Sequence, residues 1–162
     1  MATEGHNLSD FNIKGEFDFS SFKVGIVVSE WNKNITKNLL EGSIETLNNV
    51  GLKNANISVH WVPGAFELAL GCQIMCEKNL YDGIIAIGVV IQGETKHFDF
   101  VCQGATKGIM DVMLKYNTPI SFCVLTDNNI QQSIDRSGGK HGNKGVEAAV
   151  ACLKMIELKK LK

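Results

Sequence analysis

Four short apolar segments constrain the fold of this chain more than any other feature. They cover residues 24–28, 57–62, 84–91 and 120–125, and all four are rich in β-branched side chains. Segments this apolar are typical of strands in a parallel sheet that is covered on both faces. The sequence therefore predicts four buried, parallel strands.

Helical patterns separate the four segments. Apolar residues recur at spacings of three to five along residues 35–50, 66–75 and 98–113. Gly51 provides a C-terminal stop for the first of these helices, and Pro119 follows the third. Strands and helices are thus predicted to alternate along the chain.

Two further helices are predicted towards the C-terminus. Asp127 is expected to cap a short helix that ends near Arg136, where Ser137-Gly138-Gly139 interrupts it, and a last helix covers residues 146–156. The resulting order β-α-β-α-β-α-β-α-α predicts a three-layer α/β sandwich around a four-stranded parallel sheet, with right-handed crossovers. We expect one domain over residues 21–162.

The first twenty residues are polar and lack sustained periodicity, so they are interpreted as an N-terminal arm. Four apolar residues within this arm could still pack as an added edge strand. They are Phe11, Ile13, Phe17 and Phe19.

Composition narrows the class of protein. The formal net charge of −1 argues against nucleic acid as the main partner, and no apolar stretch is long enough for a membrane span. The five cysteines are odd in number and lack metal-ligand spacing, so we expect buried, reduced thiols. These features, with no signal-peptide pattern, predict a protein of the cytoplasm or another reducing, soluble compartment.

Ligands of open α/β sheets bind outside the carboxyl ends of the strands. The third predicted strand ends in Val89-Val90-Ile91, and Gly93-Glu94-Thr95 then leads into a helix with His97 in its first turn. Backbone amides at a helix start attract anions, and a histidine exchanges protons near neutral pH. The pattern suggests an enzyme acting on a phosphorylated small molecule. An ordinary strand-to-helix corner with a surface histidine is the alternative.

The two preceding corners carry an aromatic and a carboxylate. Trp31 could stack on a flat ring, or it could fold back on its own helix. Pro63-Gly64-Ala65-Phe66-Glu67 forms a tight turn into a helix. Glu67 either complements the helix dipole, which is the favoured interpretation, or binds polyol hydroxyl groups.

Three later residues have competing interpretations. Phe122 alternates with apolar neighbours in the fourth strand, which favours a core position. Arg136 could grip a phosphate with two N–H groups, or it could belong to a solvated helix end. The segment 140–145 does not match a P-loop, because Gly145 follows Lys144. His60, inside the second strand, is expected to be a packing residue.

Four segments in order resemble the lumazine synthase family: residues 63–67, 93–99, 135–138 and 142–145. The resemblance extends from about residue 22 to residue 159. It implies a flavodoxin-like fold and an enzyme that needs neither metal nor organic cofactor. The reaction implied joins 5-amino-6-(D-ribitylamino)uracil to 3,4-dihydroxy-2-butanone 4-phosphate and yields 6,7-dimethyl-8-ribityllumazine, phosphate and water, the penultimate step of riboflavin biosynthesis.

The resemblance also implies roles for individual residues. The ribitylaminouracil would contact Trp31, Ala65, Phe66, Glu67, Val89, Val90, Ile91 and Phe122. The butanone phosphate would contact Glu94, Thr95 and Arg136, with Lys144 as an additional phosphate-side residue. His97 matches the proton donor and acceptor, and Phe122 and Arg136 match residues that an adjacent subunit supplies.

The resemblance further implies a pentamer. The compact stretch 138–145 favours a 60-subunit capsid of twelve pentamers, with riboflavin synthase as a candidate cargo. Gln92 departs from the family, because many members have Arg or Lys there. Two alternatives stay open: an archaeal-type riboflavin synthase that dismutates two lumazines, and a non-catalytic flavin-binding shell.

Overall fold

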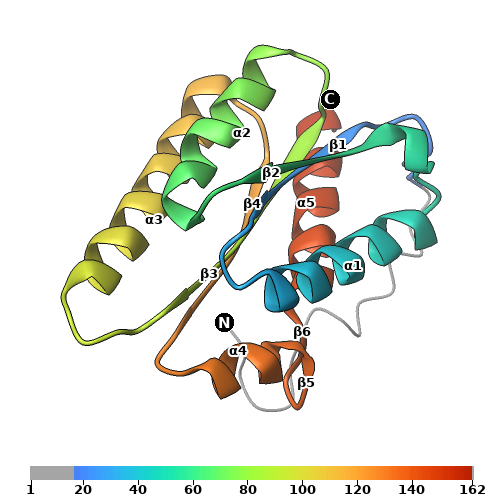
Figure 1. Cartoon of the computed structure of the whole chain (residues 1–162). Coiled ribbons are helices and arrows are strands. Elements are labelled where there is room, and N and C mark those ends of the chain that lie inside the picture. The colour runs from blue at the N-terminus through green and yellow to red at the C-terminus, as the bar shows by residue number, and fades with distance from the viewer. Residues whose placement is uncertain (1–16, 162) are drawn as a thin grey trace.

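The computed structural model describes residues 17–161 and contains a four-stranded parallel sheet (Figure 1). Its strands are β1 (Val24–Ser29), β2 (Ile57–Val62), β3 (Gly83–Ile91) and β4 (Ile120–Asp127). They lie in the order β2-β1-β3-β4. The predicted strands and the parallel α/β architecture are confirmed.

Five α-helices and two short 3₁₀ helices are seen in the described residues. They are α1 (Lys33–Asn49), η2 (Asn54–Asn56), η3 (Ala65–Glu67), α2 (Leu68–Glu77), α3 (His97–Tyr116), α4 (Ile130–Arg136) and α5 (Lys144–Lys160). Helices α1 and α5 cover one face of the sheet, and α2 and α3 cover the other (Figure 1). Apolar residues fill both interfaces, which gives the predicted three-layer αβα sandwich.

Burial differs between the central and edge strands. All six residues of β1 are buried, because two strands flank it and helices cover both its faces. Strand β2 lies at an edge of the sheet and is only half-buried to exposed. His60 is exposed there, so its predicted packing role is wrong. The apolar pattern of β2 did not reveal its edge position.

The connection after β4 differs from the prediction in two respects. Asn129, and not Asp127, caps α4: its side chain accepts a hydrogen bond from the backbone N–H of Gln132 at 3.1 Å. Asp127 is the last residue of β4 and is buried. A small antiparallel hairpin of β5 (Ser137–Gly139) and β6 (Gly142–Asn143) then leads into α5. The sequence predicted only a break there.

The described end of the N-terminal arm packs on the domain. Phe17 stacks on Phe22 with ring centroids 5.6 Å apart, and Phe19 is buried in the core beside α1 and α5. Residues 17–23 form no strand, and the rest of the predicted arm lies outside the described residues. Within residues 17–161, no helix is long and apolar enough to cross a membrane.

Candidate active site

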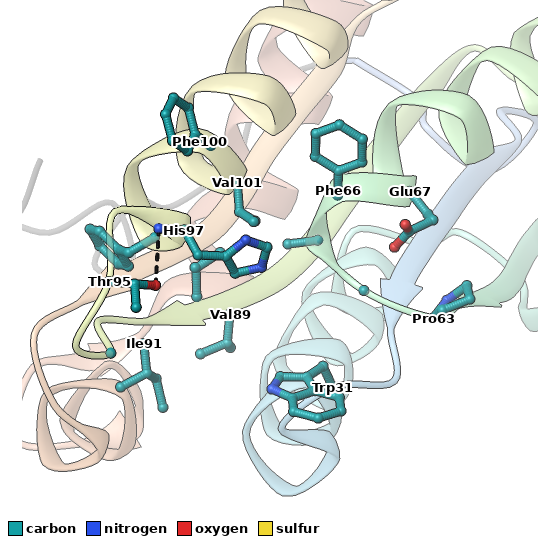
Figure 2. A pocket seen from close by; sticks show the side chains of 15 residues that line it. Trp31, Pro63, Phe66, Glu67, Val89, Ile91, Thr95, His97, Phe100 and Val101 are labelled. Carbon is teal, nitrogen blue, oxygen red and sulfur yellow. Dashed lines mark hydrogen bonds between the residues drawn. The ribbon is translucent and has the colours of Figure 1, made fainter.

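A pocket of about 670 Å³ opens at the carboxyl ends of β1, β2 and β3 (Figure 2). Its walls come from the three loops that follow these strands and from the first turns of η3 and α3. The lining residues are Trp31, Pro63, Gly64, Ala65, Phe66, Glu67, Val89, Val90, Ile91, Gly93, Thr95, His97, Phe98, Phe100 and Val101.

Trp31 reaches the pocket because two loops are tied together. The backbone N–H of Glu30 donates to the Val62 carbonyl at 2.8 Å, and that of Trp31 donates to the Pro63 carbonyl at 3.3 Å. Asn32 then adopts a left-handed conformation with φ 57°, which asparagine tolerates better than most residues. The indole is 73% exposed, so it does not fold down on its own helix.

The turn Pro63–Glu67 forms the wall opposite the β3–α3 loop. Phe66 is 59% exposed, and its ring lies along the pocket (Figure 2). The Glu67 side chain makes no helix-capping hydrogen bond. Its carboxylate lies over Gly64, where a Cβ placed on the glycine would come within 3.1 Å of Oε2. The carboxylate thus lies at the pocket wall with free acceptor capacity.

The backbone of β3 forms the pocket floor because of strand register. Pairing between β1 and β3 ends at Val28 and Ile87, whereas pairing between β3 and β4 continues to Ile91 and Asp127. The edge of residues 89–91 that faces away from β4 is therefore open towards the pocket. Backbone N–H and C=O groups on such an edge are available to pair with a planar polar ring.

Thr95 and His97 stand at the start of α3. The His97 backbone N–H donates to Thr95 Oγ1 at 3.3 Å, and the imidazole points into the pocket (Figure 2). His97 is the first residue of this 20-residue helix, so the positive end of the helix dipole lies beside it. This corner combines a proton-exchanging side chain with a local preference for anions.

The site residues expected from the sequence fall into two groups in space. Those that line the pocket are Trp31, Ala65, Phe66, Glu67, Val89, Val90, Ile91, Thr95 and His97. Those outside its lining are Glu94, Phe122, Arg136 and Lys144. The second group comprises one residue of the exposed β3–α3 loop and three residues from β4, α4 and α5.

Phe122 and Lys144 line a second, smaller cavity of about 290 Å³ between β4 and α5. Phe122 is 42% exposed, so the core position favoured for it is wrong. The Lys144 ammonium pairs with the Glu147 carboxylate one helical turn further along α5. This cavity therefore presents an aromatic ring beside an ion pair.

Three lining residues on α3 are not among the predicted contacts. Phe98, Phe100 and Val101 follow His97 closely, and Phe100 is 66% exposed. The sequence pattern places Phe98 and Val101 only on the apolar face of this helix. The sequence did contain one indication of their role. Residues three and four positions apart lie on the same face of a helix, and this spacing relates His97 to Phe100 and Val101.

The cysteines do not contribute a nucleophile. All five are free thiols, four are buried, and Cys102 is half-buried, so the predicted burial holds for four of them. Burial raises the pKa of the Cys123 and Cys152 thiols to about 12, which keeps them protonated and unreactive. In residues 17–161, no three His, Cys, Asp or Glu side chains could together hold a metal ion.

Fold and pocket together define an α/β sandwich protein that binds small molecules at the carboxyl edge of a parallel sheet. The family model described as 6,7-dimethyl-8-ribityllumazine synthase matches residues 21–160. This chain belongs to that family.

Several relatives carry the same description over nearly the whole chain. One from Christiangramia forsetii is 54% identical over 99% of this chain and 96% of its own. One from Flavobacterium johnsoniae is 52% identical over 98% of this chain and 84% of its own. A third, from Parabacteroides distasonis, is 49% identical over 96% of this chain and 98% of its own.

Proposed function

We propose that this protein is the enzyme that condenses 5-amino-6-(D-ribitylamino)uracil with 3,4-dihydroxy-2-butanone 4-phosphate to give 6,7-dimethyl-8-ribityllumazine, phosphate and two molecules of water. The observation that carries the proposal is the family match over residues 21–160 together with a pocket that gathers His97, Thr95 and Trp31 at the strand ends. An archaeal-type riboflavin synthase and a flavin-binding shell are not favoured, because the relatives are named for the synthase reaction.

The pocket suits the ribitylaminouracil. The exposed Trp31 indole offers a face for the pyrimidine ring, and the open backbone edge of Val89, Val90 and Ile91 offers donors and acceptors for its polar groups. The ribityl chain would lie along the η3 wall, where the Glu67 carboxylate can accept hydrogen bonds from hydroxyl groups. Ala65 and Phe66 line the same wall.

A role for His97 in proton transfer is supported by its place in the pocket lining. Attack of the uracil amino group on the ketone needs a proton removed from nitrogen and another delivered to the oxygen that leaves as water. Loss of phosphate then needs a proton removed from carbon. Closure of the second ring, by attack of the ribitylamino nitrogen on the remaining carbonyl group, again needs a proton removed from nitrogen and one delivered to the oxygen that leaves as a second water. A single imidazole in the pocket can serve each of these transfers in turn. Holding two substrates in one orientation supplies a further part of the rate, up to roughly 7–11 kcal/mol.

Binding of the phosphate group requires positively charged side chains, and none of the described residues that line this pocket is an arginine or a lysine. The Thr95 hydroxyl and the positive end of the α3 dipole can attract a phosphate, but Arg136 and Lys144 lie outside the lining. We therefore propose that a second copy of the chain brings Phe122, Arg136 and Lys144 to the pocket, so that the active enzyme is a homo-oligomer. A pentamer is the proposed unit, and a capsid of twelve pentamers around riboflavin synthase is the proposed larger assembly.

One assay tests the reaction. Purified protein is mixed with both substrates, and formation of the fluorescent lumazine is followed together with release of phosphate. We expect both products in equal amounts. Trp31→Ala serves as a site control, because it should raise the KM for the ribitylaminouracil about tenfold and leave the KM for the butanone phosphate nearly unchanged. Tight riboflavin binding without lumazine formation would instead support a storage shell.

A second measurement tests the assembly. Light scattering and negative-stain images of the full chain should give particles of sixty subunits. Free pentamers would contradict the capsid but not the composite site. An active monomer would contradict both.

A further inference from the structure

Asp127 is a buried carboxylate at the carboxyl end of β4, and its side-chain contacts involve α4. It is 6% exposed. Its Oδ2 accepts a hydrogen bond of 2.7 Å from the Ser133 hydroxyl, and its Oδ1 lies 3.8 Å from Arg136 Nε. Ser133 is itself completely buried. The carboxylate therefore spans from the end of the strand to two successive turns of the helix.

Two N–H groups of the Arg136 guanidinium face acceptors within the chain, and the others are free to bind a ligand. Its Nη1 donates to the backbone carbonyl of Gln132 at 3.0 Å, and its Nε faces Asp127. The side chain is 31% exposed. A guanidinium has five N–H donors, so at least three are left for an acceptor outside the chain. A bidentate anion needs two.

We propose that Asp127 is a positioning residue that orients Arg136 for the phosphate of the substrate. The proposal rests on the phosphate role given to Arg136 in the proposed function. An unrestrained arginine side chain has rotamer entropy, part of which is lost on binding. A buried carboxylate that pairs with Nε and is braced by Ser133 removes that freedom before the phosphate arrives.

The backbone fixes Asp127 itself in place. The carbonyl oxygen of Asp127 accepts a hydrogen bond of 2.9 Å from the N–H of Gln92, which begins the loop leading to Thr95 and His97. Asp127 also pairs with Ile91 in the sheet register. The residue that orients Arg136 is thus anchored to the strand that forms the floor of the same subunit's pocket.

The direction in which Asp127→Asn changes phosphate affinity distinguishes a positioning role from a purely electrostatic one. Asp127→Asn keeps the size of the side chain and an oxygen that can accept from Ser133, but it removes the negative charge. If Asp127 acted only as a nearby charge, its loss would leave Arg136 more attractive to an anion and would tighten phosphate binding. If Asp127 orients Arg136, its loss weakens phosphate binding.

The experiment measures binding of inorganic phosphate to the assembled protein by calorimetry, together with steady-state kinetics. In Asp127→Asn we expect the phosphate Kd and the KM for the butanone phosphate to rise about fivefold. The kcat and the KM for the ribitylaminouracil should stay within twofold. In an Arg136→Ala background the same substitution should have no further effect, because its target is gone.

Two further variants control the result. Asp111→Asn makes the same chemical change in the exposed ion pair with Lys107 on α3 and should leave phosphate binding unchanged. Ser133→Ala keeps the Asp127 charge but removes its brace, and it should raise the phosphate Kd about twofold. Thermal melting shows whether Asp127→Asn folds. If it does not fold, Ser133→Ala is used as the test variant instead.

The experiment distinguishes failure of the positioning role from failure of the proposed reaction. The positioning role is overturned if folded Asp127→Asn binds phosphate as tightly as the wild type or more tightly, even if lumazine is formed. If Asp127→Asn does not fold, unchanged phosphate binding in Ser133→Ala overturns it. Wild-type protein that forms no lumazine, but loses phosphate affinity in Asp127→Asn, contradicts the proposed reaction and supports the positioning role. Wild-type protein that binds no phosphate overturns the inference outright.

Discussion

The strand-end pocket and the hairpin region, which we define as residues 127–147, are built in opposite ways. The pocket is lined mainly by apolar and exposed side chains, and its walls are loops joined to one another by backbone hydrogen bonds. The hairpin region contains buried polar side chains and bonds to distant parts of the chain. Ser43 Oγ donates to the Gly145 carbonyl at 2.9 Å, and Asn143 Nδ2 donates to the Asn38 carbonyl at 2.8 Å.

The difference indicates that the two regions have different roles. In the proposed function the pocket supplies shape and one proton-exchanging group, His97, and the hairpin region supplies the positive charges of Arg136 and Lys144. A loop pocket tolerates small changes because its side chains face solvent. The hairpin region is less tolerant at its buried positions, because a shift there disturbs a packed or hydrogen-bonded neighbour. The following substitutions test this contrast.

The largest effect is expected at Gly145. A Cβ there would overlap the backbone carbonyl oxygen of Leu39, an atom that cannot rotate away. Gly145→Ala should lower the free energy of unfolding by about 3 kcal/mol or prevent folding. Gly93→Ala is the matched control in the pocket, because its Cβ would find no atom within 4 Å. Urea unfolding of both variants checks the contrast, and equal destabilisation would contradict it.

A large effect on turnover is expected at Arg136. Arg136→Ala should lower kcat/KM for the butanone phosphate about a hundredfold, because a charged hydrogen-bond partner of the phosphate is lost. His97→Ala should slow turnover less and should not abolish it, since orientation of the two substrates persists. Steady-state kinetics of the two variants gives the ranking. Unimpaired turnover in Arg136→Ala would reverse it and remove the phosphate role from the hairpin region.

A moderate effect on stability is expected at alkaline pH. The Cys123 thiol lies at the edge of the hairpin region, and burial raises its pKa from 9.0 to about 12. Above pH 9 the thiol ionises in the unfolded chain but stays protonated in the folded one, so stability falls as pH rises towards 12. Between pH 9 and 10 this thiol contributes a loss of about 1 kcal/mol.

The matched variant for this measurement is Cys102→Ala. Cys102 is half-buried on α3, beside the pocket, and burial raises the pKa of its thiol as well. Urea unfolding at fixed protein concentration should show a shallower pH dependence in Cys123→Ala than in Cys102→Ala. The same pH dependence in both variants would show that the two regions bury their thiols alike.

The smallest effect is expected where Phe66 rests on α3. A Cβ at Gly104 would come within 2.6 Å of the Phe66 ring, which is free to move because it is exposed. Gly104→Ala should therefore raise the KM for the ribitylaminouracil about threefold with little loss of stability. Gly108→Ala instead meets the Ala69 methyl at 2.7 Å, so it should destabilise by about 1–3 kcal/mol and leave the KM unchanged. The reverse pattern would contradict the role of Gly104.

Much of the fold was predictable because its signals are local. A run of β-branched residues indicated each strand, and the predicted ends of β2 match the structure. The edge position of β2 was not predictable, since its apolar content resembles that of a central strand. The cap of α4 was misassigned to Asp127 because Asp and Asn are both good capping residues, and only the three-dimensional course of the chain selects Asn129.

The candidate site was predictable in part for a similar reason. Residues that follow a strand must lie at its carboxyl end, so the positions of Trp31, Phe66 and His97 in the pocket followed from the alternation of elements. The exposure of Phe122 was missed because alternation along β4 does not say which face a neighbouring helix leaves uncovered. Phe100 was missed because it lies outside the apolar pattern of this helix, and an isolated exposed aromatic residue carries no local sign of a binding role.

The sequence by itself determined the αβα sandwich, the order of its elements and the corners that carry His97 and Trp31, because periodicity and turn residues act over short distances. Only the tertiary structure decided the rest. The register of β3 against β1 opens the backbone of residues 89–91 to the pocket, and packing of α4 against β4 buries Asp127 beside Arg136. Both features depend on how whole elements pack against one another, which no local pattern encodes.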